Sequence, residues 1–321
     1  MPKLDCIRVS AVFALGLAAA PAAAQSYPAR AVRVIVPLAP GGGSDITARQ
    51  FANKLSEALG QQFVIDNRGG AGGLSGIEQA AKSPPDGYTL LMVGGGYAAT
   101  AALQKNSAEA IRALVPVVEF GITPFVLSVH PAVPAKSTRE LIALARAHPG
   151  QLAYASAGIG GITHLATELF ARAAGITLTH VPYKSTGAAM TDLLAGQVPV
   201  IVGSLLPMVP YIQSGRMRPL GVTTAKRWYS LPDLPALAEV LPGYEVELAF
   251  GALAPRGTPQ NIIDAVNAAV NNALLQADMK KNLEAQGMLG TGGPPQHYAA
   301  RIRGDFEKWS KLVREADIRA E

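Results

Sequence analysis

Three strand-like segments in the first third of the chain each run directly into a glycine-rich loop. The loop PGGGSD follows the run AVRVIVPL, the loop NRGGAGGLSG follows QFVIDN, and the loop GGGYAA follows YTLLMV. Helix-like patterns alternate with these strands, an order that builds a parallel sheet covered by helices. Because the carboxyl ends of parallel strands lie along one edge, we expect the three loops to meet at the edge where ligands bind.

The same order of elements begins again near Pro124. The strand-like LAYAS leads into the loop SAGIGG and the helix-like ITHLATELFARAAG, and strands and helices then alternate onward to RPLGVTT. Apolar residues recur at helical spacing over residues 262–274 and 298–313, which predicts two helices packed on the core. The sequence therefore predicts a second α/β unit built like the first.

The start of the chain has the features of a secretory signal peptide. Lys3 and Arg8 precede an apolar run that is too short to span a membrane, and a small-residue pattern predicts cleavage after Ala24. Cleavage would remove Cys6, the single cysteine, so the exported chain is expected to fold without a disulfide.

The net charge and the distribution of Lys and Arg indicate which kinds of ligand or macromolecule the protein could bind. The formal net charge of +5 suits anionic ligands or an anionic membrane surface, and it also suits plain solubility. Lys and Arg do not cluster with interleaved aromatic residues, so we predict no nucleic-acid partner.

The first loop has the composition of an anion site. Pro40, Gly41 and Gly42 let backbone N–H groups point together, and Ser44 or Asp45 can cap the helix that follows. The positive end of that helix suits a carboxylate or phosphate, although the same residues also suit a tight turn. No GK[ST] follows the glycines, so the loop is not a nucleotide-binding P-loop.

The loop of the second unit repeats this arrangement and adds hydroxyl groups. Ser156, Gly158 and Gly160 precede a helix start at which His164 lies. His164 and Glu168 stand four residues apart and could bind a metal from one helix face. No third ligand is near in sequence and HExxH is absent, so a capping or surface histidine is the preferred interpretation and no metal is predicted.

Other motifs give weaker signals. Tyr183 and Lys184 follow a strand, where Lys184 could offer a positive charge to an acid or could be simply solvated. The loop from Gly94 fits G-x-G-x-x-A, but it does not open the domain and exported proteins have little access to nicotinamide, so no cofactor is predicted. Catalysis has no signature either, because G-x-S-x-G is absent and the histidines are scattered.

The combined pattern resembles the Bug-type extracytoplasmic solute-binding proteins that serve tripartite tricarboxylate transporters. The matching stretches are PGGGSDITAR, NRGGAGG, PDGYTLL, YASAGIGGITHLATELF, VPYKSTGAAMTDLLAGQV, SGRMRPLGVTT, LPDLPALAEVLPGYE and APRGTP. The resemblance implies an α/β fold with the two-lobed, type II-like Venus flytrap architecture of periplasmic binding proteins. Each lobe would hold a mostly parallel sheet flanked by helices, and two crossover strands would join the lobes.

The resemblance also implies a division of the chain. Residues 1–24 would be the signal peptide, residues 27–125 and 248–321 lobe 1, and residues 126–247 lobe 2. The crossings near GITPFVLSV and VELAFGALAP would act as the hinge.

The implied function is that of a periplasmic monomer, not an enzyme, which delivers a small carboxylate to the integral-membrane subunits of a transporter. An exported enzyme acting on a small anion, or a ligand-sensing partner of a signalling protein, are the alternatives.

The resemblance places a ligand cleft between the lobes. Its substrate-binding residues would be Pro40, Gly41, Gly42, Ser44, Asp45, Asn67, Ala71, Gly72, Gly95, Ser156, Gly158, Gly160, His164, Tyr183 and Lys184. Ser185 stands where the family has glycine, Gly161 where it has threonine, Pro199 where it has aspartate, and Ala249 and Phe250 where a tryptophan is usual. These differences leave the identity of the carboxylate open.

The mode of binding follows from what the cleft lacks. Arg49 is expected inside a helix, and Arg68 precedes the glycines and points away. We therefore expect backbone N–H groups of PGGGSD and SAGIGG to hold the carboxylate, with water and hydroxyl groups helping.

Overall fold

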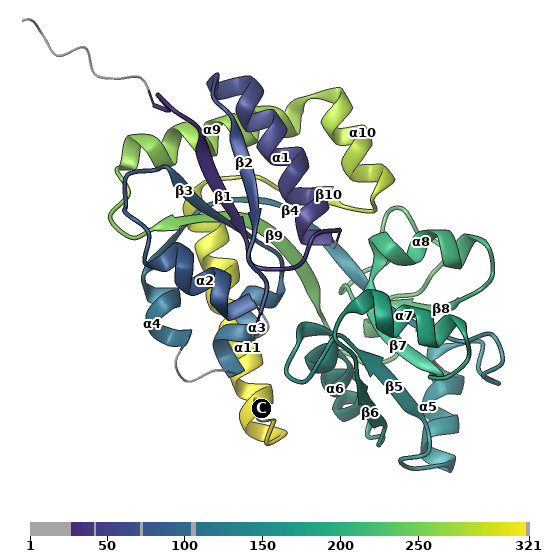
Figure 1. Ribbon diagram of the computed structural model, residues 1–321. Helices are drawn as coiled ribbons and strands as arrows, with labels where there is room; N and C mark the ends of the chain where they lie inside the picture. Colours follow the sequence, from purple (N-terminus) through teal and green to yellow (C-terminus); the bar gives the residue numbers. More distant parts are fainter. Residues whose placement is uncertain (1–26, 42, 71–72, 104–106, 319–321) are drawn as a thin grey trace, which may run out of the picture.

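The computed structural model describes residues 27–41, 43–70, 73–103 and 107–318. The predicted signal peptide and three predicted cleft residues, Gly42, Ala71 and Gly72, lie outside these ranges. Two lobes lie side by side, each with strands at its centre and helices around them (Figure 1). Within the described ranges, no helix combines the length and apolarity that crossing a membrane requires.

One continuous sheet runs through both lobes in the order β2-β1-β3-β9-β4-β7-β5-β6, and β8 and β10 pair with β4. The strands are β1 (Val32–Val36), β2 (Phe63–Asn67), β3 (Thr89–Val93), β4 (Leu114–Val129), β5 (Ala153–Ser156), β6 (Thr179–Pro182), β7 (Val200–Ser204), β8 (Arg218–Val222), β9 (Glu247–Pro255) and β10 (Leu289–Gly290). β1 pairs in parallel with β2 and β3, and β5 with β6 and β7, whereas β4 and β9 run antiparallel to their neighbours. Each lobe thus has the parallel sheet that the alternating pattern predicts.

Helices cover both faces of the sheet. They are α1 (Gly43–Leu59), α2 (Leu74–Ala81), α3 (Gly96–Leu103), α4 (Ser107–Arg112), α5 (Thr138–Ala147), α6 (Ile162–Ala174), α7 (Thr186–Leu194), α8 (Leu205–Gln213), α9 (Gln260–Leu275), α10 (Ala277–Ala285) and α11 (Pro295–Glu315), with a short 3₁₀ helix at Leu237–Glu239. Every residue of β3 is buried, as expected for a strand covered by helices on both sides.

Local signals fix several helix ends. Ser137 caps α5 by accepting a hydrogen bond from the Glu140 amide, and α6 ends at Gly175, whose φ of 60° favours glycine. The sequence predicts Thr258 as the cap of α9, but this is wrong: Pro259 is the N-cap, and the Thr258 hydroxyl donates to the Pro255 carbonyl at 2.7 Å. The apolar stripe of α11 also includes Phe306, which is 39% exposed.

β4 is the long strand that passes from one lobe to the other. Its residues 114–124 pair with β9, and its residues 125–129 pair with β7. β9 returns alongside it, so the chain crosses twice between the lobes (Figure 1). We propose that the lobes meet where the partners of β4 change, in line with the predicted boundaries at residues 125 and 248.

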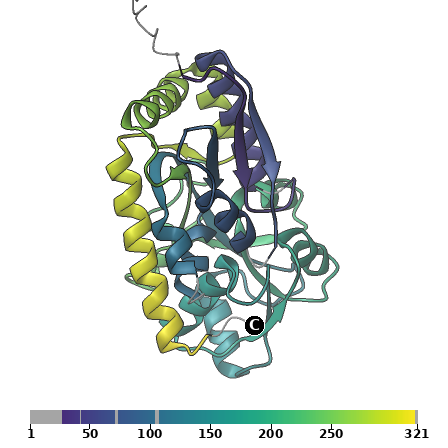
Figure 2. The same ribbon diagram turned by 60° about the vertical axis from the view of Figure 1, so that its left-hand side comes forward.

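Contacts beyond the two strands also join the lobes. α11 runs down one side of the molecule past both lobes (Figure 2), and its Glu315 lies 3.6 Å from Arg172 of α6. On another side, the Trp228 indole N–H donates to the Gly287 carbonyl at 2.9 Å. Any movement of the lobes about β4 and β9 therefore changes these contacts as well.

Candidate functional site

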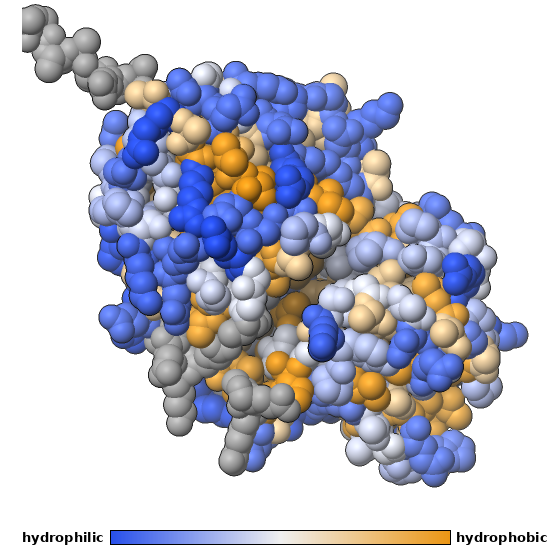
Figure 3. All heavy atoms as spheres, in the orientation of Figure 1, coloured by the Kyte–Doolittle hydropathy of each residue, from blue (hydrophilic) through white to orange (hydrophobic). Residues whose placement is uncertain are grey.

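The starts of three helices come together where the lobes meet. A Cβ atom at Gly94, just before α3, would lie 2.7 Å from Ser44 Oγ in the first turn of α1. A Cβ atom at Gly96 would lie 4.0 Å from Ile162 Cγ2 at the start of α6. The surface is hollowed between the two lobes, with hydrophobic atoms inside the hollow (Figure 3). Helix starts from both lobes therefore converge in one region, and such starts attract anions.

Below this region lies the ring of Phe250, a residue of β9. A Cβ atom at Gly94 would come within 3.1 Å of Phe250 Cε1, and one at Gly43 within 3.9 Å of Phe250 Cζ. Phe250 is buried, so its ring supports the two glycine loops from beneath. Gly95 passes equally close to β9, because a Cβ atom there would lie 3.0 Å from Leu248 Cα.

The first loop is fastened by a buried carboxylate. Asp45 Oδ2 accepts hydrogen bonds from the Gly41 amide and from Arg49 Nε, both at 3.0 Å, and Asp45 Oδ1 accepts one from Asn67 Nδ2 at 3.0 Å. Burial by itself would raise the pKa of the Asp45 carboxyl, but the bonds from Arg49, Gly41 and Asn67 lower it below its ordinary value. The structure thus brings together Gly41, Asp45 and Asn67, three predicted site residues, with both carboxylate oxygens engaged in the loop.

Arg49 and Arg68, the two arginines beside this loop, are both paired with protein carboxylates. Arg49 also donates to Asn67 Oδ1 at 3.2 Å, and Arg68 Nε donates to Asp66 Oδ1 at 2.8 Å. Pro40 lies in the turn just before Gly41. Both arginines therefore have protein partners, and the expectation that backbone donors hold the anion stays a prediction.

The second loop is fastened by neutral side chains. The Gly160 amide donates to His164 Nδ1 at 2.9 Å, and the Gly158 amide donates to Ser156 Oγ at 3.2 Å. Gly158 and Gly160 have φ of 120° and 71°, values that favour glycine. Four predicted site residues are therefore brought together, but the two glycine amides serve the loop itself.

Two further amides of this loop also have partners within it. The Ala157 amide donates to Thr163 Oγ1 at 2.9 Å, and the Gly161 amide donates to the Gly158 carbonyl at 3.2 Å. The N–H groups in the first turn of α6, which begins at Ile162, have no carbonyl within the helix to bind. These first-turn amides are accordingly better placed to receive an anion than the loop amides that the sequence singled out.

Three rings are stacked behind the second loop. The His164 and His180 rings lie 4.0 Å apart between centroids at 5°, and Tyr154 stacks on His180 at 4.9 Å. Tyr154 and His180 were not singled out from the sequence, because they meet only through the pairing of β5 with β6. No local pattern could have revealed them.

The electrostatics of this stack follow from burial. Burial lowers the pKa of His164 to about 4, and burial together with the neighbouring His164 lowers the pKa of His180 to about 4. The Tyr154 hydroxyl donates to Glu168 Oε1 at 2.6 Å, and burial together with this bond raises the pKa of Tyr154. Both histidines are thus neutral around neutral pH.

Comparison with known proteins identifies the family. The family described as the tripartite tricarboxylate transporter family receptor matches residues 47–318. The chain belongs to this family. It is 35% identical to the protein BugT of Bordetella pertussis over 320 residues, which cover 97% of this chain and 98% of that one. The resemblance to Bug-type proteins inferred from the sequence is confirmed.

Two solved structures show the architecture of this receptor. Rpa4515 of R. palustris with adipate has a TM-score of 0.84 and 37% identity, over 91% of this chain and 99% of that one. MatC from Rhodopseudomonas palustris with bound malate has a TM-score of 0.81 and 31% identity, over 89% of this chain and 100% of that one. The predicted two-lobed periplasmic-binding-protein fold is confirmed, and members of this family are periplasmic solute-binding receptors.

The receptor does place a serine beside a histidine, the pair that an enzyme would need. Ser156 Oγ lies 2.6 Å from His180 Nε2. However, Ser156 is fully buried, and its oxygen also accepts from the Gly158 amide. A nucleophile must reach its substrate, so this serine is held as a part of the loop.

The remaining predicted residues lie at the edge of this region. The Tyr183 hydroxyl donates to Asp192 Oδ2 at 2.9 Å, and burial together with that bond raises the pKa of Tyr183 to about 12. Lys184 is exposed. Across the described part of the receptor, no three His, Cys, Asp or Glu side chains gather in a way that could hold a metal ion.

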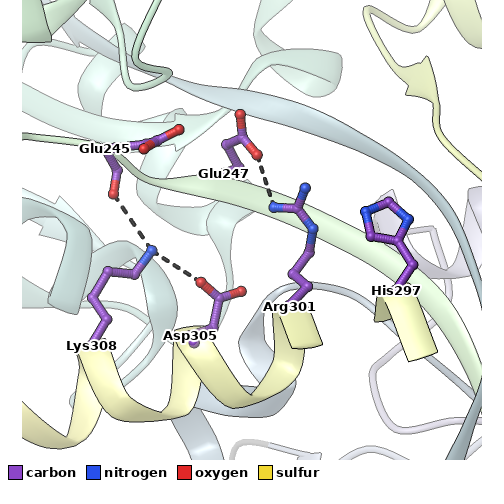
Figure 4. Close-up of a pocket in the computed structure, with 7 residues that line it drawn as sticks. Glu245, Glu247, His297, Arg301, Asp305 and Lys308 are labelled. Atoms are coloured by element: carbon purple, nitrogen blue, oxygen red, sulfur yellow. Dashed lines mark hydrogen bonds and ion pairs between the residues drawn. The ribbon is translucent and has the colours of Figure 1, made fainter. Parts of the chain in front are cut away.

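A cavity of about 340 Å³ lies elsewhere, between α11 and the start of β9 (Figure 4). Its lining includes Glu247, Arg301, Asp305 and Lys308, and these side chains pair with one another: Arg301 with Glu247 at 2.9 Å and Lys308 with Asp305 at 3.0 Å. Arg301 also pairs with the fully buried Glu119 of β4 at 2.7 Å. The two ion pairs of Arg301 connect α11 to both crossing strands, which gives this wall of the cavity a structural part in the receptor.

Proposed function

We propose that this receptor captures a small dicarboxylate in the hollow between its lobes and delivers it to the membrane subunits of a tripartite tricarboxylate-type transporter. The observation that carries the proposal is the convergence of the starts of α1, α3 and α6, which come from both lobes. Relatives with bound adipate and malate support a ligand with two carboxylates.

The two lobes suit the two ends of such a ligand. One carboxylate meets the first turn of α1 in lobe 1, and the other meets the first turn of α6 in lobe 2. Because Asp45 engages Arg49, and Asp66 engages Arg68, the anion is held by backbone donors. A ligand that spans both lobes also favours their closed arrangement, because it binds that arrangement better.

Thermal unfolding in the presence of candidate ligands tests the proposal. Adipate or malate at a hundred times its Kd should stabilise the fold by about 2.7 kcal/mol. Hexanoate, which matches adipate in chain length but lacks one carboxylate, is the control and should stabilise less. Stabilisation by sugars or amines with none by any acid would overturn the proposal.

Delivery and the absence of turnover need separate measurements. Uptake of labelled ligand into vesicles that contain the membrane subunits should depend on added receptor, and the ligand should be recovered unchanged. Recovery of a converted product would favour an enzyme, and binding without stimulated uptake would favour a sensor. We also propose that the receptor acts as a monomer, which sedimentation with and without ligand would test.

A further inference from the structure

We propose that His164 and His180 hold the loop of residues 156–161 in place in a proton-sensitive way, called the lock below, and that the first turn of α6 binds its anion only while both rings are neutral. The inference rests on the proposed function, because it concerns the same hollow. It adds a regulation of that site and a role for His180, which no motif in the sequence indicates.

His164 acts on the loop directly. It lies in the first turn of α6, and its Nδ1 accepts the hydrogen bond from the Gly160 amide at 2.9 Å. Only an unprotonated Nδ1 can accept such a bond. A proton on Nδ1 would make the His164 N–H face the Gly160 N–H, so the hydrogen bond between them would break. The turn that leads into α6 would then lose this contact.

His180 acts through Ser156. Its Nε2 lies 2.6 Å from Ser156 Oγ, the atom that also accepts from the Gly158 amide. Its ring lies flat against that of His164 at 4.0 Å. Like charges at this separation repel strongly in a buried place, so the stack cannot hold two protonated rings.

The surroundings offer the rings little help in becoming charged. Glu168 of α6 has its Oε1 3.9 Å from His164 Nε2 and favours the charged rings, but burial outweighs it, and the same oxygen also accepts the Tyr154 hydroxyl from β5. From α11, Glu315 faces Arg172, two turns further along α6. From α3, the loop meets the apolar Leu103 at Gly160.

The direction of the pH effect follows from linkage. Both rings have a pKa of about 4 in the folded state against an ordinary value of 6.5, so the lock is complete above pH 6.5 and weakens as the pH falls toward 4. Between neutral pH and about pH 5, each histidine shifts the balance toward the unlocked loop by a factor on the order of ten.

Two substitutions remove the proton sensitivity and keep the hydrogen bonds. In His164→Asn the side-chain oxygen can accept from the Gly160 amide, and in His180→Gln the amide group can reach Ser156. Calorimetric titration with adipate is carried out near neutral pH and at about pH 5, and the affinity of each protein at about pH 5 is compared with its own affinity near neutral pH. At about pH 5 the wild type should lose up to about a hundredfold more affinity than the double variant, about tenfold for each histidine.

The design separates protein effects from ligand effects. Adipate takes up the same protons in both experiments, so the ratio of the two losses reports the histidines alone. The exposed His148 in the same lobe is the matched control, and His148→Asn should keep the wild-type pH profile. Equal losses in wild type and the double variant would overturn the lock.

A measurement without ligand keeps the inference independent of the proposed function. Nuclear magnetic resonance of the two rings should show both titrating far below 6.5, with faster exchange of the Gly160 amide once they do. Rings that titrate near 6.5 without any change at Gly160 would overturn the lock. A wild type that binds no dicarboxylate at neutral pH would instead overturn the proposed function, and the lock would then be judged by the ring titrations.

Discussion

The loops before α1 and α6 are both rich in glycine, but a charged side chain holds the first loop and neutral side chains hold the second. The loop before α1 is fastened by the charged Asp45, which engages Arg49 and Asn67. The loop before α6 is fastened by the neutral His164 and by Ser156. In both loops a side chain accepts hydrogen bonds from the loop's own amides. The protonation of that side chain therefore sets the pH range over which the loop keeps its shape.

The two fastenings should fail at different acidities. The pKa of Asp45 lies below its ordinary value of 3.8, so its contribution is present above pH 3.8 and is lost only as the pH falls through the lowered value. The contribution of the histidines is already declining between pH 6.5 and 4. Acid should therefore loosen lobe 2 before lobe 1.

The largest effect is expected from Gly160→Ala, compared with Gly41→Ala. Both glycines have positive φ, 71° and 83°, so each alanine costs about 1–2 kcal/mol of backbone strain. A Cβ atom at Gly160 would also collide with Leu103 of α3, whereas among the described residues nothing beyond the chain neighbours lies within 4 Å of one at Gly41. Overpacking adds about 1–3 kcal/mol, so Gly160→Ala should lower the free energy of unfolding by more, as measured in urea.

The added variant Leu103→Ala sharpens this test. It makes room for the alanine Cβ, so the double variant should recover part of the loss that Gly160→Ala causes. If the two glycine variants lowered the free energy of unfolding equally, the close packing of α3 against the second loop would add nothing to the cost of Gly160→Ala.

A smaller effect is expected from Asp45→Asn, compared with His164→Asn. The first change removes a charge that accepts three hydrogen bonds and should cost about 1–2 kcal/mol of unfolding free energy near neutral pH. The second keeps a neutral acceptor for Gly160 and should cost less. High salt should weaken the wild-type Asp45 contacts, because Arg49 is half exposed, and should leave the second loop unaffected. A larger loss in His164→Asn would reverse the comparison.

The smallest effect is expected from Lys184→Ala. This side chain is exposed, so its truncation should change unfolding free energy by less than about 0.5 kcal/mol. Since backbone donors hold the anion, adipate affinity in calorimetric titration should change by no more than about twofold. A tenfold loss would mean that the site depends on side-chain charge.

Much of the fold could be predicted because its signals are local. The runs that became β1, β2 and β3 depend on neighbouring residues, and sequence reasoning found them. Helix α10 and the exposure of Phe306 were missed, because both depend on packing against distant elements.

The site divides in the same way. Glycine loops between strands and helices announce themselves in the sequence, because only glycine adopts the positive φ seen at Gly41, Gly158 and Gly160 without strain. The hydrogen-bond partners of the side chains in those loops could not be predicted in the same way. Asn67 reaches Asp45 from β2, and His180 reaches Ser156 from β6, across separations that no local pattern records.

The sequence by itself therefore determined the alternation of strands and helices, because propensity, periodicity and turn chemistry act over a few residues, and its motifs showed the resemblance to the family. Only the tertiary structure decided that one loop is fastened by charge and the other by a pair of stacked neutral rings. The physical reason is that burial and hydrogen bonding set the protonation of Asp45, His164 and His180, and both arise only when the sheet brings remote strands side by side.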